Sequence, residues 1–339
     1  NSAGGNSAGG NSAGGNSAGG NSAGGSTQIA VSVTPTRISG PAPLAVLFDA
    51  TGTTSSLTTL PFHELTYAFD FGDPGSGTWA LTGLPKNTQS GGPLAAHVFD
   101  VPGTYTVTVR ATRMAASSTS TVTITVTNPA NHWPGLNTVV VSTSGNFAGA
   151  PAGAEQRTTL PASYDGKRVL LRRGETFGAV SIEGTADNVL VGAFGTGAKP
   201  IVQSVALSGN GNVADWPDDV TVMDLDIAIN FTVAVTASRV LLYRCDLDTP
   251  SNPEGMVDLA GGVGFYYANG MAPQSAYYWP NQIFLVDNHI EGDTNGDGFP
   301  NCTVAGFFMK SAIMGNTINK ATEHSLRIFA TNRTFIGHN

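Results

Sequence analysis

The chain has 339 residues, of which only 12% are charged and 43 are glycine. This abundance of small residues indicates β architecture and argues against long helices. The formal net charge of −8, without a cluster of basic residues, argues against nucleic acid and anionic membrane surfaces as partners. No apolar run approaches the roughly 18 residues that a membrane-spanning helix requires.

Residues 1–25 are five copies of Asn-Ser-Ala-Gly-Gly. Alanine is their only apolar residue, so they cannot bury enough surface to offset the entropy of ordering, and we predict a flexible tether. The alternative is an assembly or modification element whose serines are glycosylation candidates: Ser2, Ser7, Ser12, Ser17 and Ser22. If this arm is ordered, we expect it to be extended and held by glycans or by strand addition to a neighbour's open sheet edge. Because Asn1 is neither Met nor the start of a signal peptide, we expect a mature form or a fragment.

From residue 26 to about residue 130, apolar and polar residues alternate in short runs separated by turn signals such as Pro102-Gly103. Alternation with a period of two places one face of each strand in a core. We therefore predict an antiparallel β-sandwich of roughly 100 residues. Its expected strands include residues 29–33, 45–48, 67–71, 105–109 and 122–126.

Two stretches of this segment, Tyr67–Asp73 and His97–Val109, resemble the paired signatures of a PKD domain and stand in the expected order. The resemblance implies an immunoglobulin-like sandwich that serves exported proteins as a non-catalytic spacer or contact module. It therefore implies an extracellular setting. Asp70 and Asp73 stand near a turn, where carboxylates accept hydrogen bonds from backbone N–H groups. We expect that capping role, with a surface calcium site as the alternative.

The pattern changes at residue 131. Asp165–Phe177 and Val189–Ile201 resemble the opening coils of right-handed parallel β-helix proteins of the pectin-lyase-like group, with a Gly-rich turn between strands. The resemblance implies a right-handed parallel β-helix over residues 131–339. The expected fold class is thus all-β, with a low-complexity arm, an immunoglobulin-like sandwich over residues 26–130 and a β-helix.

A six-residue phrase recurs in the last third of the chain, with an apolar residue at each end and usually Asn at the fourth position. Its copies are Val222–Ile227, Leu242–Leu247, Leu285–Ile290, Ile313–Ile318 and the incomplete Ile336–Asn339. The two apolar residues are five positions apart, so only a tight bend brings both to one interior. We assign a left-handed bend to the Asn, which tolerates that conformation.

The copies of the phrase begin 20, 43, 28 and 23 residues apart, which is typical of solenoid rungs with inserted loops. The chain stops inside a rung at Asn339. We expect the natural protein to be longer, or another subunit to cover the unpaired backbone groups of that rung.

Carboxylates are the candidate catalytic groups. β-Helix enzymes that act on polysaccharides usually place carboxylates, or carboxylate-bound calcium with an Arg or Lys base, on one exposed sheet. Stacked rungs lie about 4.8 Å apart, close enough for the paired carboxylates that hydrolysis requires. The alternative is solvent-facing residues beside bends, where Asp is favoured anyway. The candidates are Asp224, Asp226, Asp246 and Asp248. We interpret the group Glu323, His324 and Arg327, which has no nucleophile, as the polar exterior of a rung.

Asp293, Asn295 and Asp297 match the first half of a calcium loop, with oxygen ligands at alternate positions before a glycine. The twelfth position of that pattern is Val304 in place of a bidentate Glu, which excludes a complete EF-hand loop. Two interpretations remain: a shorter insertion that bound calcium makes rigid, and a turn rich in Asn, Asp and Gly without calcium.

Six aromatic residues stand on a Gly-rich insertion between the second and third copies of the phrase. Exposed rings of this kind suit stacking against sugars, so they are candidate glycan-binding residues. The alternative is that they clasp the side of the β-helix. They are Phe265, Tyr266, Tyr267, Tyr277, Tyr278 and Trp279.

The two cysteines, Cys245 and Cys302, form neither a disulfide framework nor a zinc motif. Cys245 holds the place that Asn has in other copies of the phrase, so we expect a small buried side chain, and a bridge to Cys302 stays open. N-glycosylation triplets begin at Asn230, Asn301 and Asn332.

The sequence favours a non-catalytic, exported structural or adhesive protein, such as a subunit of an extracellular fibre or surface layer. The expected partners are further copies of the chain or another surface protein, with a polysaccharide as a further option. The alternatives are a polysaccharide lyase or glycoside hydrolase acting on the β-helix face, and a glycan-binding module. No cofactor is required by the sequence, and calcium is the one ion it suggests.

Overall fold

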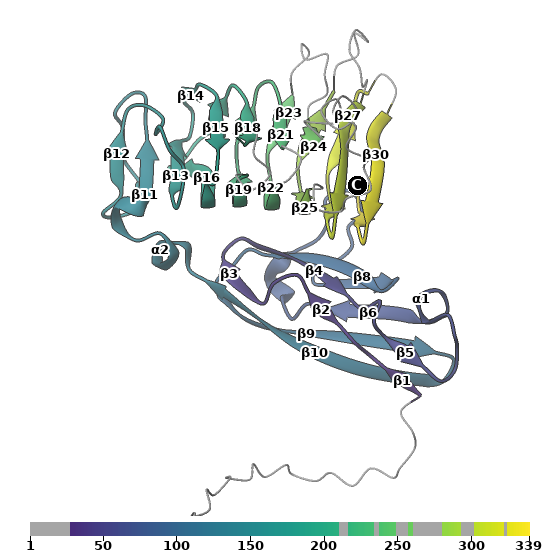
Figure 1. Ribbon diagram of the computed structural model, residues 1–339. Helices are drawn as coiled ribbons and strands as arrows, with labels where there is room; N and C mark the ends of the chain where they lie inside the picture. The colour runs from purple at the N-terminus through teal and green to yellow at the C-terminus, as the bar shows by residue number, and fades with distance from the viewer. Residues whose placement is uncertain are drawn as a thin grey trace, which may run out of the picture.

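The computed structural model describes residues 28–209, 216–233, 237–248, 257–259, 280–292, 302–321 and 324–339. Within these ranges the protein is all-β, as the sequence predicts. An immunoglobulin-like sandwich is followed by a parallel β-helix, and the two lie side by side (Figure 1).

Two sheets and a separate strand pair build the sandwich. The five-stranded sheet has the order β3 (Ser39–Pro41), β10 (Ala116–Thr127), β9 (Gly103–Arg113), β6 (Thr66–Asp70) and β7 (Thr88–Gly91). The three-stranded sheet has the order β2 (Thr34–Pro35), β4 (Leu44–Asp49) and β8 (Leu94–Phe99), while β1 (Ile29–Ala30) pairs with β5 (Thr54–Ser55). Short helices are α1 (Pro61–Glu64) and α2 (Pro129–His132), with 3₁₀ turns at Pro74–Ser76 and Gly135–Asn137.

The core of the sandwich follows from the period-two pattern. On β6 the side chains of Tyr67 and Phe69 are buried while their neighbours are exposed. They pack with Phe48 of β4 and Phe99 of β8, so the aromatic residues of the motif hold the two sheets together.

Three rows of parallel strands build the β-helix. The first row contains β12 (Glu155–Arg157), β11 (Thr138–Val141), β13 (Arg168–Arg172), β16 (Asp187–Phe194), β19 (Asp218–Met223), β22 (Ser238–Tyr243), β25 (Asn281–Val286), β28 (Ala312–Met314) and β31 (Phe335–Gly337). The second row contains β14 (Thr176–Phe177), β17 (Ile201–Val202), β20 (Asp226–Ile227), β23 (Asp246–Asp248), β26 (His289–Glu291) and β29 (Thr317–Asn319). The third row contains β15 (Val180–Glu183), β18 (Val205–Ser208), β21 (Phe231–Val233), β24 (Val257–Leu259), β27 (Cys302–Met309) and β30 (His324–Asn332).

Each copy of the phrase is one corner of this β-helix. The first residues of the copies lie in one register, from Val222 through Leu242, Leu285 and Ile313 to Ile336. The final residues lie in the second row and also face the interior, so a bend does bring both apolar positions into one core.

The bend itself is one position earlier than the sequence suggested. The left-handed residue is the third of each copy, with φ between 54° and 67°: Asp224, Arg244, Asp287, Gly315 and His338. A left-handed residue interrupts the alternation of the strand, so the fourth side chain turns into the interior. The amide of the Asn is thereby placed for hydrogen bonding inside the β-helix, and our assignment of the bend to Asn is wrong.

An asparagine ladder fills this corner. Asn288 donates from Nδ2 to the Leu242 carbonyl (3.0 Å), and its Oδ1 accepts from the Cys245 N–H (2.9 Å). Asn316 repeats both bonds one rung on, and its Nδ2 reaches the Oδ1 of Asn339 at 2.8 Å. Asn288 and Asn316 thus each satisfy two backbone groups of the preceding rung inside an apolar core.

In the rung before Asn288, Cys245 occupies the position that Asn has in the later copies of the phrase. It is a free, fully buried thiol, and burial raises its pKa to about 12. A thiol with a raised pKa in an apolar site is inert, which agrees with the expected structural role.

We predict that Asn316→Ala destabilises the β-helix by at least about 2 kcal/mol, because the Leu285 carbonyl and the Asn288 N–H lose their partners inside the core. The exposed Asn319, three residues away, supplies the control Asn319→Ala. Urea unfolding of both variants provides the measurement. Equal losses in the two variants would show that the ladder contributes nothing specific.

Candidate functional site

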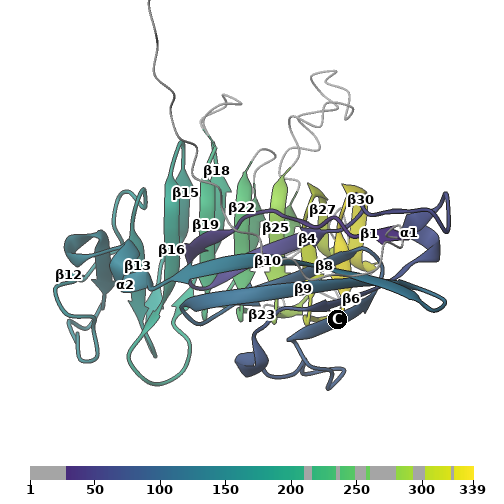
Figure 2. The ribbon, with the colours of Figure 1, turned by 90° about the horizontal axis from the view of Figure 1, so that it is seen from below.

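The sandwich is docked on the outer face of the first row. Its strands run along the axis of the β-helix, across the rungs (Figure 2). Ala45 and Leu47 of β4 and Ala96 and Val98 of β8 point away from the core of the sandwich and are buried. They meet the outward side chains Leu241, Tyr243, Phe284, Val286, Ala312 and Met314 of the first row. We call this apolar contact the domain junction.

Ion pairs flank the domain junction on both sides. Arg244 donates to Asp100 of the sandwich at 2.6 Å, and Arg333 lies 3.0 Å from the Asp49 carboxylate. Two further pairs are Arg37 with Asp219 and Lys86 with Asp287. In all four pairs the β-helix partner is a left-handed residue (Arg244, Arg333, Asp219 and Asp287). Partly exposed pairs contribute little free energy, so their main effect is to fix orientation around an apolar centre.

Trp79 is the anchor of the domain junction. The indole ring is 5% exposed and stacks on the His338 ring, with centroids 4.9 Å apart and planes at 8°. Lys86 Nζ covers the ring at 4.9 Å from its centroid. A Cβ on Gly315 would lie 2.4 Å from Trp79 Cε3, so glycine leaves the notch that the indole occupies.

A buried histidine lies beside this anchor. His97 Nε2 lies 2.9 Å from Asp73 Oδ2, and the ring stacks on Phe71 with centroids 4.5 Å apart. Burial lowers the pKa of His97, although the Asp73 carboxylate acts in the opposite direction. Burial outweighs the carboxylate because the ring lies between the side chains of Phe71 and Phe99, so His97 is neutral at pH 7. Both residues line a crevice of about 280 Å³ between the domains.

The other motif aspartate has the expected capping geometry. Asp70 Oδ1 accepts from the Gly72 N–H and from Asn87 Nδ2, both at 3.0 Å. Among the described residues, no cluster of three His, Cys, Asp or Glu side chains is arranged to hold a metal ion.

The four candidate residues lie in two parts of the β-helix, one in the bend and three in the second row. Asp224 is in the bend, where Arg244 Nε donates to it at 3.0 Å. Asp226 and Asp246 are register partners on adjacent rungs of the second row, and Lys199 Nζ lies 2.8 Å from Asp246 Oδ1. Asp248 lies two positions after Asp246 in β23, and its register partner in β26 is Glu291. The structure thus brings together Asp226 and Asp246 but turns Asp224 toward the domain junction.

The remaining candidates are placed as follows. Asn230 precedes β21, and the exposed Asn332 ends β30. His324 is exposed at the start of β30, three residues before Arg327. Several candidates lie outside the described residues: the five serines of the arm, the six aromatic residues of the insertion, Asp293, Asn295, Asp297, Asn301 and Glu323.

Sequence reasoning missed the domain junction, although a signal was present. Three strands are unbroken apolar runs: Leu44–Phe48, Val240–Tyr243 and Ile283–Val286. A strand with one solvent-exposed face would instead alternate apolar and polar residues. Such runs indicate strands that are buried on both faces. The three runs contain most of the residues that form the domain junction.

Comparison with known proteins supports the first of the two domains. The PKD domain family model matches residues 30–126. No curated protein matches the chain. No helix among the described residues is both long and apolar enough to cross a membrane.

We predict that Gly315→Ala displaces Trp79 and loosens the docked sandwich. The matched control is Gly184→Ala, which has the same left-handed φ (66° against 67°) but no atom within 4 Å of the added Cβ. The control is expected to lose about 1–2 kcal/mol from backbone strain alone. The Gly315 variant should lose more and show a larger radius of gyration by X-ray scattering. An unchanged radius with equal losses would contradict the role of the notch.

We predict that stability falls as the pH drops below about 6.5, the ordinary pKa of histidine. The lowered pKa of folded His97 means that the unfolded chain takes up the proton first, so the stabilisation is present above 6.5 and lost below it. The loss is at most about 1.4 kcal/mol per pH unit for one proton. Urea unfolding at pH 7.5 and 5.0 should show a smaller loss in His97→Gln than in the wild type. The exposed His63 supplies the control His63→Gln, which should behave as the wild type.

Proposed function

We propose that this chain is a non-catalytic exported protein with a structural or adhesive role, a subunit of an extracellular fibre or surface layer. The observation that carries the proposal is the docking of the sandwich along the first row, with a buried apolar centre and ion pairs on both sides. A spacer needs no such fixation. A rigid two-domain body is suited to transmitting load or presenting a surface.

The match to the PKD family supports the extracellular setting, since domains of that family are typical of exported proteins. The net charge of −8 favours partners other than nucleic acid. The partners we propose are further copies of the chain, joined through the arm of residues 1–25, and a surface polysaccharide.

The second candidate function is hydrolysis or elimination on a polysaccharide. It is favoured by Asp226 and Asp246, which lie on adjacent rungs of the second row. We rank it lower because Lys199 pairs with Asp246, and Asp224 pairs with Arg244 at the domain junction. The face of the first row that could hold a polymer is instead covered by the sandwich.

We predict that the full-length protein forms particles larger than a monomer in negative-stain microscopy and light scattering. Deletion of residues 1–25 should leave folded monomers. A variant whose arm is a Gly/Ser linker of equal length serves as the control and should also stay monomeric. Unchanged assembly after the deletion would reduce the arm to a passive spacer.

The catalytic alternative has its own test. The proposed function predicts no release of reducing sugar or unsaturated product from neutral and acidic polysaccharides. Release by the wild type that disappears in Asp226→Asn and Asp246→Asn would reverse the ranking of the two functions.

A further inference from the structure

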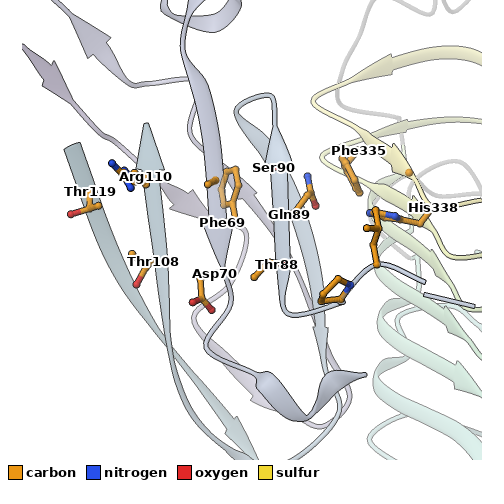
Figure 3. Close-up of a pocket in the computed structure, with 14 residues that line it drawn as sticks. Phe69, Asp70, Thr88, Gln89, Ser90, Thr108, Arg110, Thr119, Phe335 and His338 are labelled. Carbon is orange, nitrogen blue, oxygen red and sulfur yellow. The ribbon is translucent and has the colours of Figure 1, made fainter. Parts of the chain in front are cut away.

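A groove of about 630 Å³ crosses the outer face of the five-stranded sheet and ends against the last rung of the β-helix. It runs from Thr119 on β10 over β9, β6 and β7 to Phe335 and His338 (Figure 3). Adjacent strands lie about 4.8 Å apart, so the groove is roughly 15 Å long across the sheet. Its volume is that of a small-ligand site, and both domains line it.

The floor of the groove is built from two rows of side chains that the strand register sets side by side. Thr119, Arg110, Ala68 and Ser90 form one row, since each is the register partner of the next. Thr108, Asp70 and Thr88 form the other. Hydroxyl groups therefore alternate with one guanidinium and one carboxylate, so that donors and acceptors are both available and their formal charges cancel.

The far wall of the groove is apolar and held in place. Phe335 stands beside His338, whose ring is fixed by its stack on Trp79. Burial lowers the pKa of His338, so this ring is uncharged near neutral pH. Leu84, which is 54% exposed, adds a further apolar side chain to this wall. Ring faces of this kind pack against apolar C–H surfaces.

We propose that this groove binds a segment of a neutral polysaccharide, an inference that rests on the adhesive role proposed above and names its ligand. A pyranose ring presents hydroxyl groups around its edge and C–H groups on its faces. The two hydroxyl rows suit the edge, and Phe335 with His338 suits the face. The balance of Arg110 and Asp70 favours an uncharged ligand over an anionic one.

The groove is complete only while the sandwich is docked, because its floor belongs to the sandwich whereas Phe335 and His338 belong to the β-helix. The stack of Trp79 on His338 couples the junction to the binding site. Ligand binding therefore stabilises the docked arrangement, by the linkage between binding and folding.

The test is binding of the full-length protein to cellohexaose, xylohexaose, mannohexaose and chitohexaose, each followed by titration calorimetry. At least one of these neutral saccharides should bind saturably. Thr108→Val and Ser90→Ala remove hydroxyl groups with little change of shape, and each should weaken binding about tenfold or less; combined with Phe335→Ala they should abolish it. Thr123→Val is the matched control, because Thr123 is exposed on the same face of β10 outside the groove lining, and it should bind as the wild type.

Three results would overturn the inference: no binding of any of the four saccharides, binding unchanged in the triple variant, or an equal loss in Thr123→Val. Thermal unfolding of each variant excludes loss of fold as the cause. The test is independent of the assembly experiment, since a protein that assembles through its arm without binding saccharide would retain the structural role and lose only the groove.

Discussion

The left-handed residue at the third position of the phrase determines what each corner of the β-helix offers to its surroundings. At the third position of the phrase the backbone turns to positive φ, so the next side chain enters the core and the left-handed side chain projects outward. The inward consequence is the ladder of Asn288, Asn316 and Asn339. The outward consequence is that Arg244 and Asp287 face the sandwich. The corner and these two ion pairs of the domain junction are therefore two results of a single conformational requirement.

The domain junction changes how the sandwich should be regarded. A tethered module would present a polar outer face, yet β4 and β8 bury side chains on both of their faces. Trp79 extends this contact through a hairpin that reaches the notch at Gly315. The sandwich is thus a structural part of the β-helix surface, and its second sheet is left free to contact other molecules.

The local sequence predicted the strands and rungs, but it did not predict which distant residues they contact. The alternating runs predicted the sandwich, and within Tyr67–Asp73 the aromatic residues at a period of two share one face, which the structure buries in the core. The phrase predicted the rungs, and its copies lie in register. The bend was assigned one residue late, because propensity says that Asn tolerates positive φ but not that backbone groups of the preceding rung require its amide. The groove was not predictable, since Thr108 and Phe335 are 227 positions apart in the chain.

Trp79 and the four ion pairs hold the sandwich at points spread over five successive rungs, from β19 to β31, a distance of roughly 19 Å. The strands of the sandwich run along that distance (Figure 2). Tension applied along the axis of the β-helix would therefore load the domain junction in shear. Peeling a solenoid breaks one rung at a time, whereas shear must break the apolar contact and all of its attachments together. The resistance of the β-helix to tension along its axis is thus set by the docked sandwich more than by the contacts between rungs.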